Sequence, residues 1–201
     1  MKIKGEFKDV LSRNGVIIED RGWITNTIVP EFGNFLAAVM KKDFEVDNEI
    51  KPVGIEYMAV GSSSDNKVDV FRERVKSLFN TWNNEKSDSQ PLKEDNNNNW
   101  WIWVKKIEED DITYLNGADN QVTNKLQISV DFGPNEPYSE KTLGFKEFAL
   151  LGILKKAENE FEIEKMFFIN HACHGVIEKG NDMTIKRTVN LTFPVNEEVV
   201  S

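Results

Sequence analysis

The residues of this chain best suited to chemistry lie close together near its carboxyl end. They are His171, Cys173 and His174, which include the only cysteine and both histidines. Zinc binds imidazole nitrogen and thiolate sulfur, so a zinc site is the first interpretation to weigh. The pattern of residues 166–176 predicts a β-strand, whose side chains alternate between two faces. His171 and Cys173 would share one face and His174 the other, and a further ligand would have to come from a distant carboxylate. We therefore expect no metal and no cofactor.

Other patterns that resemble catalytic motifs are incomplete. On a strand the adjacent side chains of Cys173 and His174 diverge, which prevents them from forming a nucleophile and its base. Residues 61–64, Gly-Ser-Ser-Ser, follow a predicted strand, but the Gly-Lys-Ser/Thr ending of a phosphate-binding loop is missing. Residues 108–111, Glu-Glu-Asp-Asp, lack the spacing and the glycine of a calcium loop. We expect a turn at the first, a solvated strand end at the second, and no enzymatic activity.

A tryptophan cluster, Trp100, Trp101 and Trp103, stands at the start of the strand predicted at 100–107, beside an asparagine tract. Aromatic rings of this kind can stack on sugars, which would make a glycan-binding face. Tryptophan is also enriched in subunit interfaces, and alternate tryptophans on a strand can fill a core. We favour a core or interface role. The alternation places Trp101 and Trp103 on one side of the strand and Trp100 on the other.

The elements that position these residues are mostly strands, because apolar residues alternate with period two. We expect eight or nine strands. A Ser-Arg-Asn-Gly turn at residues 12–15 predicts a hairpin at the start of the chain. Its two strands are predicted at residues 2–10 and 15–19, and residues 21–30 are expected to be extended. Further strands are predicted at residues 54–60, 100–107 and 125–132, with three or four more between 143 and 193.

Three segments depart from the strand pattern. Apolar residues at helical spacing, with an acidic residue early and lysines late, predict an amphipathic helix at about 31–42. A looser pattern over residues 69–80 predicts a short second helix. Residues 83–99 are polar and end in four consecutive asparagines, so we expect a surface loop or a disordered insertion there.

The composition fits a single β-rich domain spanning residues 1–201. The net charge of −9 gives a surface that repels nucleic acid and anionic lipid. One cysteine excludes an intrachain disulfide. The first residues lack the apolar run of a signal peptide, and no segment approaches the roughly 18 apolar residues that span a bilayer. We expect a protein made in a cytoplasm, with neither nucleic acid nor membrane as a partner.

Six segments of the sequence form a recognisable series: residues 21–26, 55–62, 145–152, 168–171, 176–179 and 183–193. In this order they resemble segments of small tail-associated structural proteins of bacteriophages. The order is also similar to that of the collar-type, baseplate-attaching domain of phage tail fibres. Lys146 stands where the pattern usually has arginine, and residues 83–99 have no counterpart in it.

This resemblance implies a non-enzymatic structural component of a phage tail, neck/collar or baseplate, or of a related tail-like injection particle. Such a protein would be assembled in the bacterial host cytoplasm and located in the virion. Its partners would be other virion or tail proteins and copies of itself, arranged as a ring or trimer. The expected fold is mainly β, an antiparallel β-sandwich with one helix packed on it. We predict that its core contains Trp23, Phe35, Phe148, Phe168 and Phe193.

Two alternatives remain open. The first is a fibre or decoration protein that binds a cell-surface glycan through Trp100, Trp101 and Trp103. The second is an enzyme or metalloprotein that uses the histidines and the cysteine of residues 171–174. Metal analysis of the purified protein separates the second alternative from the other two.

Overall fold

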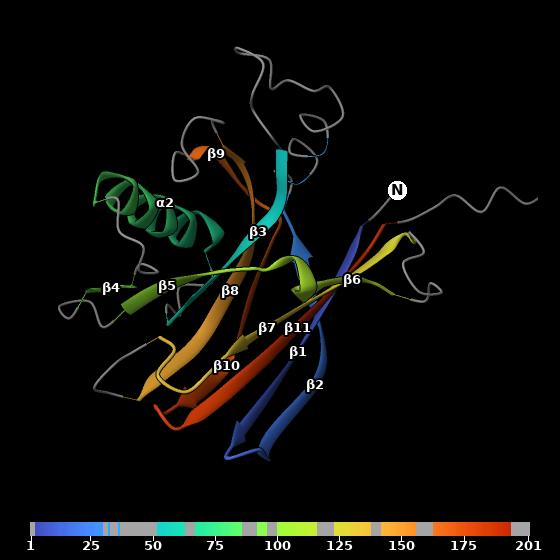
Figure 1. Ribbon diagram of the computed structural model, residues 1–201, viewed down its shortest axis with the longest axis vertical. Coiled ribbons are helices and arrows are strands. Elements are labelled where there is room, and N and C mark those ends of the chain that lie inside the picture. The colour runs from blue at the N-terminus through green and yellow to red at the C-terminus, as the bar shows by residue number, and fades with distance from the viewer. Residues whose placement is uncertain are drawn as a thin grey trace, which may run out of the picture.

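Strands make up most of the chain that the structure describes (Figure 1). The computed structural model describes residues 3–29, 32, 36, 52–62, 67–85, 92–95, 100–115, 123–137, 142–155 and 163–193. The elements in chain order are β1 (Lys4–Arg13), β2 (Val16–Ile28), β3 (Pro52–Gly61), α2 (Val68–Glu85), β4 (Leu92–Asp95), β5 (Trp100–Lys106), the 3-10 helix η1 (Glu109–Asp111), β6 (Ile112–Tyr114), β7 (Lys125–Phe132), β8 (Leu143–Lys155), β9 (Ile163–Phe168), β10 (Asn170–Lys179) and β11 (Met183–Thr192).

The first two strands form a hairpin around a two-residue turn. Asn14 and Gly15 occupy that turn with φ angles of 49° and 76°. Positive φ at both central positions matches the right-handed twist of the flanking strands, and Asn-Gly is the pair that adopts it most readily. The hairpin predicted from the sequence is therefore confirmed.

The strands pair antiparallel in one sheet of eleven strands, with the order β4-β5-β3-β8-β10-β2-β1-β11-β7-β6 and β9 paired to β8. The mainly antiparallel β class is confirmed. Instead of two separate sheets, a single sheet curls so that its two halves face each other. The first half contains β2, β1, β11, β7 and β6, and the second half contains β4, β5, β3, β8, β10 and β9.

The two halves join where β10 changes partner, and we call this short pairing the seam. Asn170 and His171 of β10 pair with Ile28 and Thr27 of β2. From the next residue onward β10 pairs with β8 instead. Because β10 leaves β2 after two residues, most of β2 has β1 as its only strand neighbour in the described part of the chain.

The main core fills the space between the two halves of the sheet. Phe7 of β1 packs edge-on against Phe148 of β8, with ring centroids 4.8 Å apart. Phe132 of β7 lies 5.7 Å from Phe145 of β8 in a similar edge contact. Aromatic pairs in this arrangement add to the stabilisation that comes from burying their area.

A second core lies on the outer face of the β3–β5–β8 region, where α2 covers the sheet (Figure 1). Phe71, Val75, Leu78 and Phe79 of α2 are buried at helical spacing. The helix predicted at 69–80 is confirmed and extends to Glu85. No helix in the described ranges is long and apolar enough to cross a membrane.

The helix predicted at 31–42 falls mostly outside the residues that the structure describes. Phe32 and Leu36 are helical, and Phe32 is buried. Parts of the stretch predicted as a loop or insertion, 83–99, are regular: residues 83–85 end α2, and residues 92–95 form β4, which pairs with β5. Its other residues lie outside the description.

The predicted core residues have different outcomes. Phe148 and Phe168 are fully buried. Phe193 is partly buried against the main core, and Phe35 lies outside the described residues. The prediction for Trp23 was wrong, because its side chain is 49% exposed. Trp23 lies on β2 beyond the two residues that pair with β10, where β1 is the only strand that pairs with β2 in the described part of the chain.

Candidate functional site

The histidine–cysteine segment lies on β10, at and just beyond the seam. His171 and Cys173 point to the same side of the strand, with the Cys173 sulfur 3.7 Å from the His171 Nε2 atom. His174 points to the opposite side, toward Phe7. The alternation predicted from the sequence is therefore confirmed, and the three side chains belong to two different environments.

On the face of β10 that points toward Phe7 in the main core, His174 contacts a buried ion pair. Arg187 donates from Nε and Nη2 to the two carboxylate oxygens of Asp9, at 2.6 and 2.7 Å. The His174 Nε2 atom is 2.7 Å from Arg187 Nη2, and its Nδ1 atom is 2.7 Å from the Gly175 carbonyl. Arginine only donates, so Nε2 accepts and Nδ1 carries the proton.

The charge state of His174 follows from this arrangement. Burial and the neighbouring Arg187 guanidinium lower the pKa of His174 to about 4, and they outweigh the Gly175 carbonyl and the Asp9 carboxylate. His174 is therefore neutral near pH 7. This network holds β1, β10 and β11 together, and its geometry suits packing better than proton transfer.

On the other face of β10, the Glu147 carboxylate lies close to His171 and Cys173. The Glu147 Oε2 atom lies 3.4 Å from His171 Nε2, and the ligand-type atoms of Glu147, His171 and Cys173 all lie within 4.8 Å of one another. Burial and the Glu147 charge raise the pKa of the Cys173 thiol to about 11. A thiol with that pKa stays protonated at neutral pH, which does not favour a nucleophile, since the thiolate is the reactive form.

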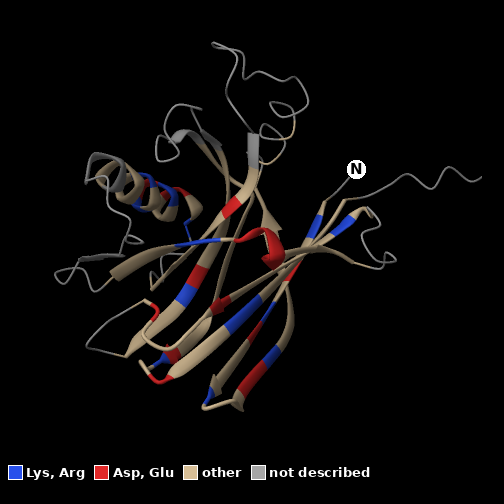
Figure 2. Cartoon of the chain, viewed as in Figure 1, with Lys and Arg blue, Asp and Glu red and all other residues tan. Residues whose placement is uncertain are grey.

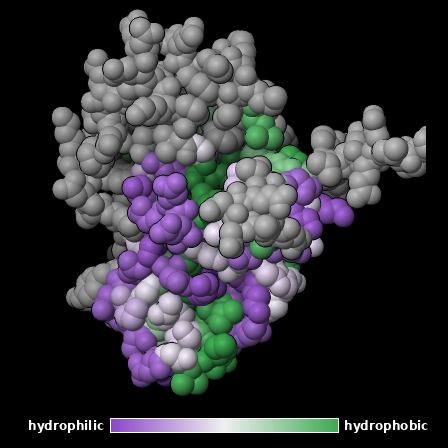
Figure 3. Space-filling model, turned by 45° about the vertical axis from the view of Figure 1, so that its right-hand side comes forward, coloured by the Kyte–Doolittle hydropathy of each residue, from purple (hydrophilic) through white to green (hydrophobic). Residues whose placement is uncertain are grey.

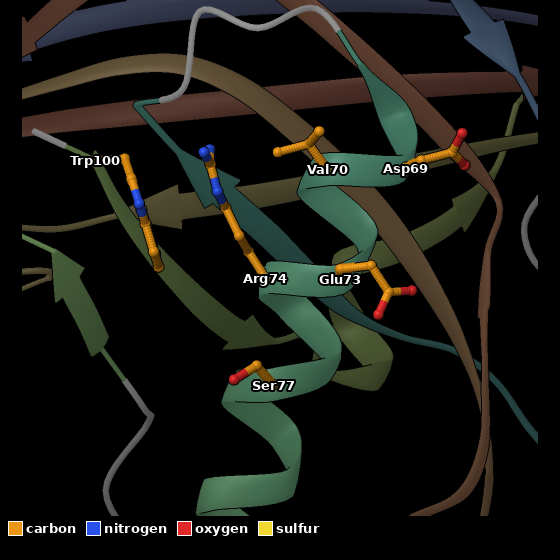
Figure 4. A pocket seen from close by; sticks show the side chains of 6 residues that line it. All are labelled: Asp69, Val70, Glu73, Arg74, Ser77 and Trp100. Carbon is orange, nitrogen blue, oxygen red and sulfur yellow. The ribbon is translucent and has the colours of Figure 1, made fainter. Parts of the chain in front are cut away.

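The tryptophan cluster divides between two environments. Trp101 and Trp103 are buried in the main core, on the side of β5 that the alternation predicts. Trp100 packs on the opposite side and lines an open groove of about 520 Å³ between α2 and β5. The other residues lining this groove are Asp69, Val70, Glu73, Arg74 and Ser77 (Figure 4).

One face of the Trp100 ring is already covered by another side chain, that of Arg74. The Arg74 guanidinium lies 4.7 Å from the centre of the Trp100 ring, and Figure 4 shows the two side chains side by side. A sugar stacking on this face would have to displace a cation–π contact. Together with the burial of Trp101 and Trp103, this contact disfavours a glycan platform built from all three tryptophans.

The two remaining motifs have structural roles where they are described. The Ser62 hydroxyl oxygen accepts a hydrogen bond from the Trp101 backbone N–H at 3.0 Å, which ties the end of β3 to β5. Residues 63 and 64 lie outside the described ranges. In the acidic run, Glu108 and Asp111 form a reciprocal capping box around η1. Their carboxylates accept hydrogen bonds from backbone N–H groups.

The β1–β2 hairpin carries a group of exposed apolar residues that the sequence patterns did not predict. Val16, Ile17 and Ile18 are between 51% and 68% exposed, and Trp23 and Ile24 continue the exposed residues along β2. We call these five residues the hairpin patch. In Figure 3 hydrophobic side chains gather at the lower end of the molecule, where Figure 1 shows this hairpin. Three consecutive aliphatic residues beside a tight turn were the available signal.

The strand that carries the hairpin patch has an open edge. Residues 16–26 of β2 pair with β1 on one side, and no strand in the described part of the chain pairs with the other side. The charged side chains of β2 are matched within the molecule: Asp20 binds Lys8 at 2.8 Å, and Glu19 binds Arg21 at 2.7 Å. Figure 2 shows acidic and basic residues interspersed on these strands.

No protein-family model, curated protein or solved structure matches this chain.

Proposed function

We propose that this protein is a non-enzymatic structural subunit of a bacteriophage tail, neck/collar or baseplate, or of a related tail-like injection particle. The observation that carries the proposal is the hairpin patch on the open edge of β2. An exposed apolar edge strand is a template for pairing with another chain, and soluble proteins usually blunt or cover such edges. A subunit that is covered after assembly needs no such protection.

The occupant that we propose for this edge is a second copy of the chain. Each copy has a net charge of −9, so most of its surface repels another copy. The charges of β2 are the exception, because Glu19 and Asp20 are each paired with a cation of the same molecule. Two copies can therefore meet at β2 with little repulsion, and strand addition would join their backbones.

Light scattering of the purified chain tests the contact. We expect the wild-type protein to self-associate above its protomer mass of 23.1 kDa as its concentration rises. Replacing Ile17→Lys places a charge in the hairpin patch and should keep the protein at protomer mass. Asn80→Lys adds the same charge on the exposed side of α2 and should self-associate like the wild type.

A second measurement tests the particle assignment itself. Negative-stain images of purified particles, labelled on this protein, should show the label at one fixed level of a tail, collar or baseplate. Absence of the protein from intact particles would refute the phage assignment, and a wild-type chain that stays a protomer at all concentrations would refute the β2 contact.

A further inference from the structure

We propose that Glu147, His171 and Cys173 form a zinc-binding site with three protein ligands and an open fourth position for water. The site follows from strand register. Cys173 lies directly opposite Glu147 in the antiparallel pairing of β10 with β8. His171 is two residues before Cys173 on β10, so its side chain points to the same face. Three side chains with zinc-ligating atoms thus converge on one point of the sheet surface.

The two separations that involve His171 match those of a tetrahedral zinc site, and all three ligand atoms lie within 4.8 Å of one another. With Zn–S near 2.3 Å and Zn–N and Zn–O near 2.0–2.1 Å, a tetrahedron places N and S about 3.6 Å apart and N and O about 3.4 Å apart. The observed separations are 3.7 Å from Cys173 Sγ to His171 Nε2 and 3.4 Å from Glu147 Oε2 to His171 Nε2. His171 Nε2 therefore already lies at ligand spacing from both neighbours.

The surroundings suit a coordinated ion. Glu147 is 1% exposed and His171 is 7% exposed, and the Phe71 ring of α2 lies 5.3 Å from the His171 ring. A Cβ atom at Gly61 would come within 3.3 Å of Glu147 Oε1, so glycine leaves room beside that carboxylate. Cys173 is only partly buried, which gives the ion a path from solvent.

The donor set selects the metal. Sulfur together with imidazole nitrogen favours zinc over calcium or magnesium, which prefer oxygen ligands. On binding, the Cys173 thiol transfers its proton to solvent as the Zn–S bond forms, and His171 contributes its Nε2 lone pair. A thiolate and a carboxylate ligand each place one negative charge against the two positive charges of zinc, which reduces the uncompensated charge at this depth.

The test uses the isolated chain, so its outcome does not depend on self-association or on a particle. Metal is first removed with a chelator, and Zn²⁺ or Co²⁺ alone is then added. We expect one ion per chain, a rise in unfolding temperature with zinc, and a thiolate-to-cobalt charge-transfer band. Cys173→Ser should abolish the band and weaken zinc binding by more than the roughly 100-fold that loss of an outer-shell partner costs.

His174→Gln is the matched control, because it removes the other histidine from the opposite face of the same strand. We expect this variant to keep one ion per chain, the cobalt band and the zinc-induced rise in unfolding temperature. Each variant is compared with its own metal-free form, so a change in intrinsic stability does not mask the result. Absence of stoichiometric binding by the wild type, or equal zinc binding by Cys173→Ser, would overturn the proposal.

Discussion

The buried ion pair between Asp9 and Arg187 gives the sharpest stability prediction for this fold. The Asp9 side chain is 2% exposed and the Arg187 side chain 0% exposed, and two short hydrogen bonds join them. Removing one partner leaves an uncompensated buried charge, which costs about 3–5 kcal/mol. For a domain of this length about 1 kcal/mol lowers the unfolding temperature by roughly 2–4 °C. Arg187→Met or Asp9→Leu alone should therefore lower it by roughly 6–20 °C.

The double variant should cost less than either single change. With both residues apolar no charge remains buried, and a methionine at 187 can keep packing against Phe148, whose ring centre lies 4.3 Å from the Arg187 guanidinium. One defect persists, because His174 loses the donor to its Nε2 atom. An unsatisfied buried acceptor costs about 1–3 kcal/mol, which is the net loss that we expect for the double variant.

Urea unfolding of the wild type, both single variants and the double variant measures the coupling free energy as a double-mutant cycle. Asp20→Asn is the control, since the Lys8–Asp20 pair is partly exposed and exposed ion pairs contribute little to stability. The reasoning is refuted if the single variants cost no more than this control. It is equally refuted if the double variant loses the sum of the two single losses.

Two further predictions concern the β7–β8 turn and the tryptophans. Burial alone would raise the pKa of Glu136, but hydrogen bonds from Lys105 and Gly133 outweigh it and lower the pKa. This stabilisation is fully present above the ordinary carboxyl pKa and is lost as the pH falls through the folded pKa. Glu136→Gln should therefore destabilise the protein at neutral pH, and the loss should shrink as the pH falls below the ordinary carboxyl pKa, which urea unfolding at a series of pH values measures. Trp101→Ala should cost about 3–5 kcal/mol because the ring is buried, whereas Trp100→Ala should cost clearly less; equal losses in thermal unfolding would contradict this.

Features set by neighbouring residues could be predicted from the sequence. The Asn14–Gly15 turn needs only the φ preferences of two residues. The division of Trp101 and Trp103 from Trp100 needs only the alternation of a strand. The face shared by His171 and Cys173 follows from the same rule, and all of these predictions are confirmed.

Features that depend on pairing between distant strands could not be predicted. Trp23 has the residue type and spacing of a core position, but its exposure depends on where β10 leaves β2. Glu147 comes opposite Cys173 only in the observed register of β8 and β10. A shift of one residue would turn Glu147 to the other face of the sheet. Local patterns do not contain this register.

The change of partner along β10 connects the three sites. After His171, β10 no longer pairs with β2 and pairs with β8 instead, which leaves one edge of β2 without a strand partner in the described residues. The pairing of β10 with β8 also places Cys173 opposite Glu147. Past that pair the β8–β10 register shifts, and His174 contacts Arg187 of the first half of the sheet. One strand thus creates an apolar edge, a candidate zinc site and a buried ionic contact within a few residues. Because the zinc ligands and the hairpin patch share no residue, variants in one should leave the other measurable.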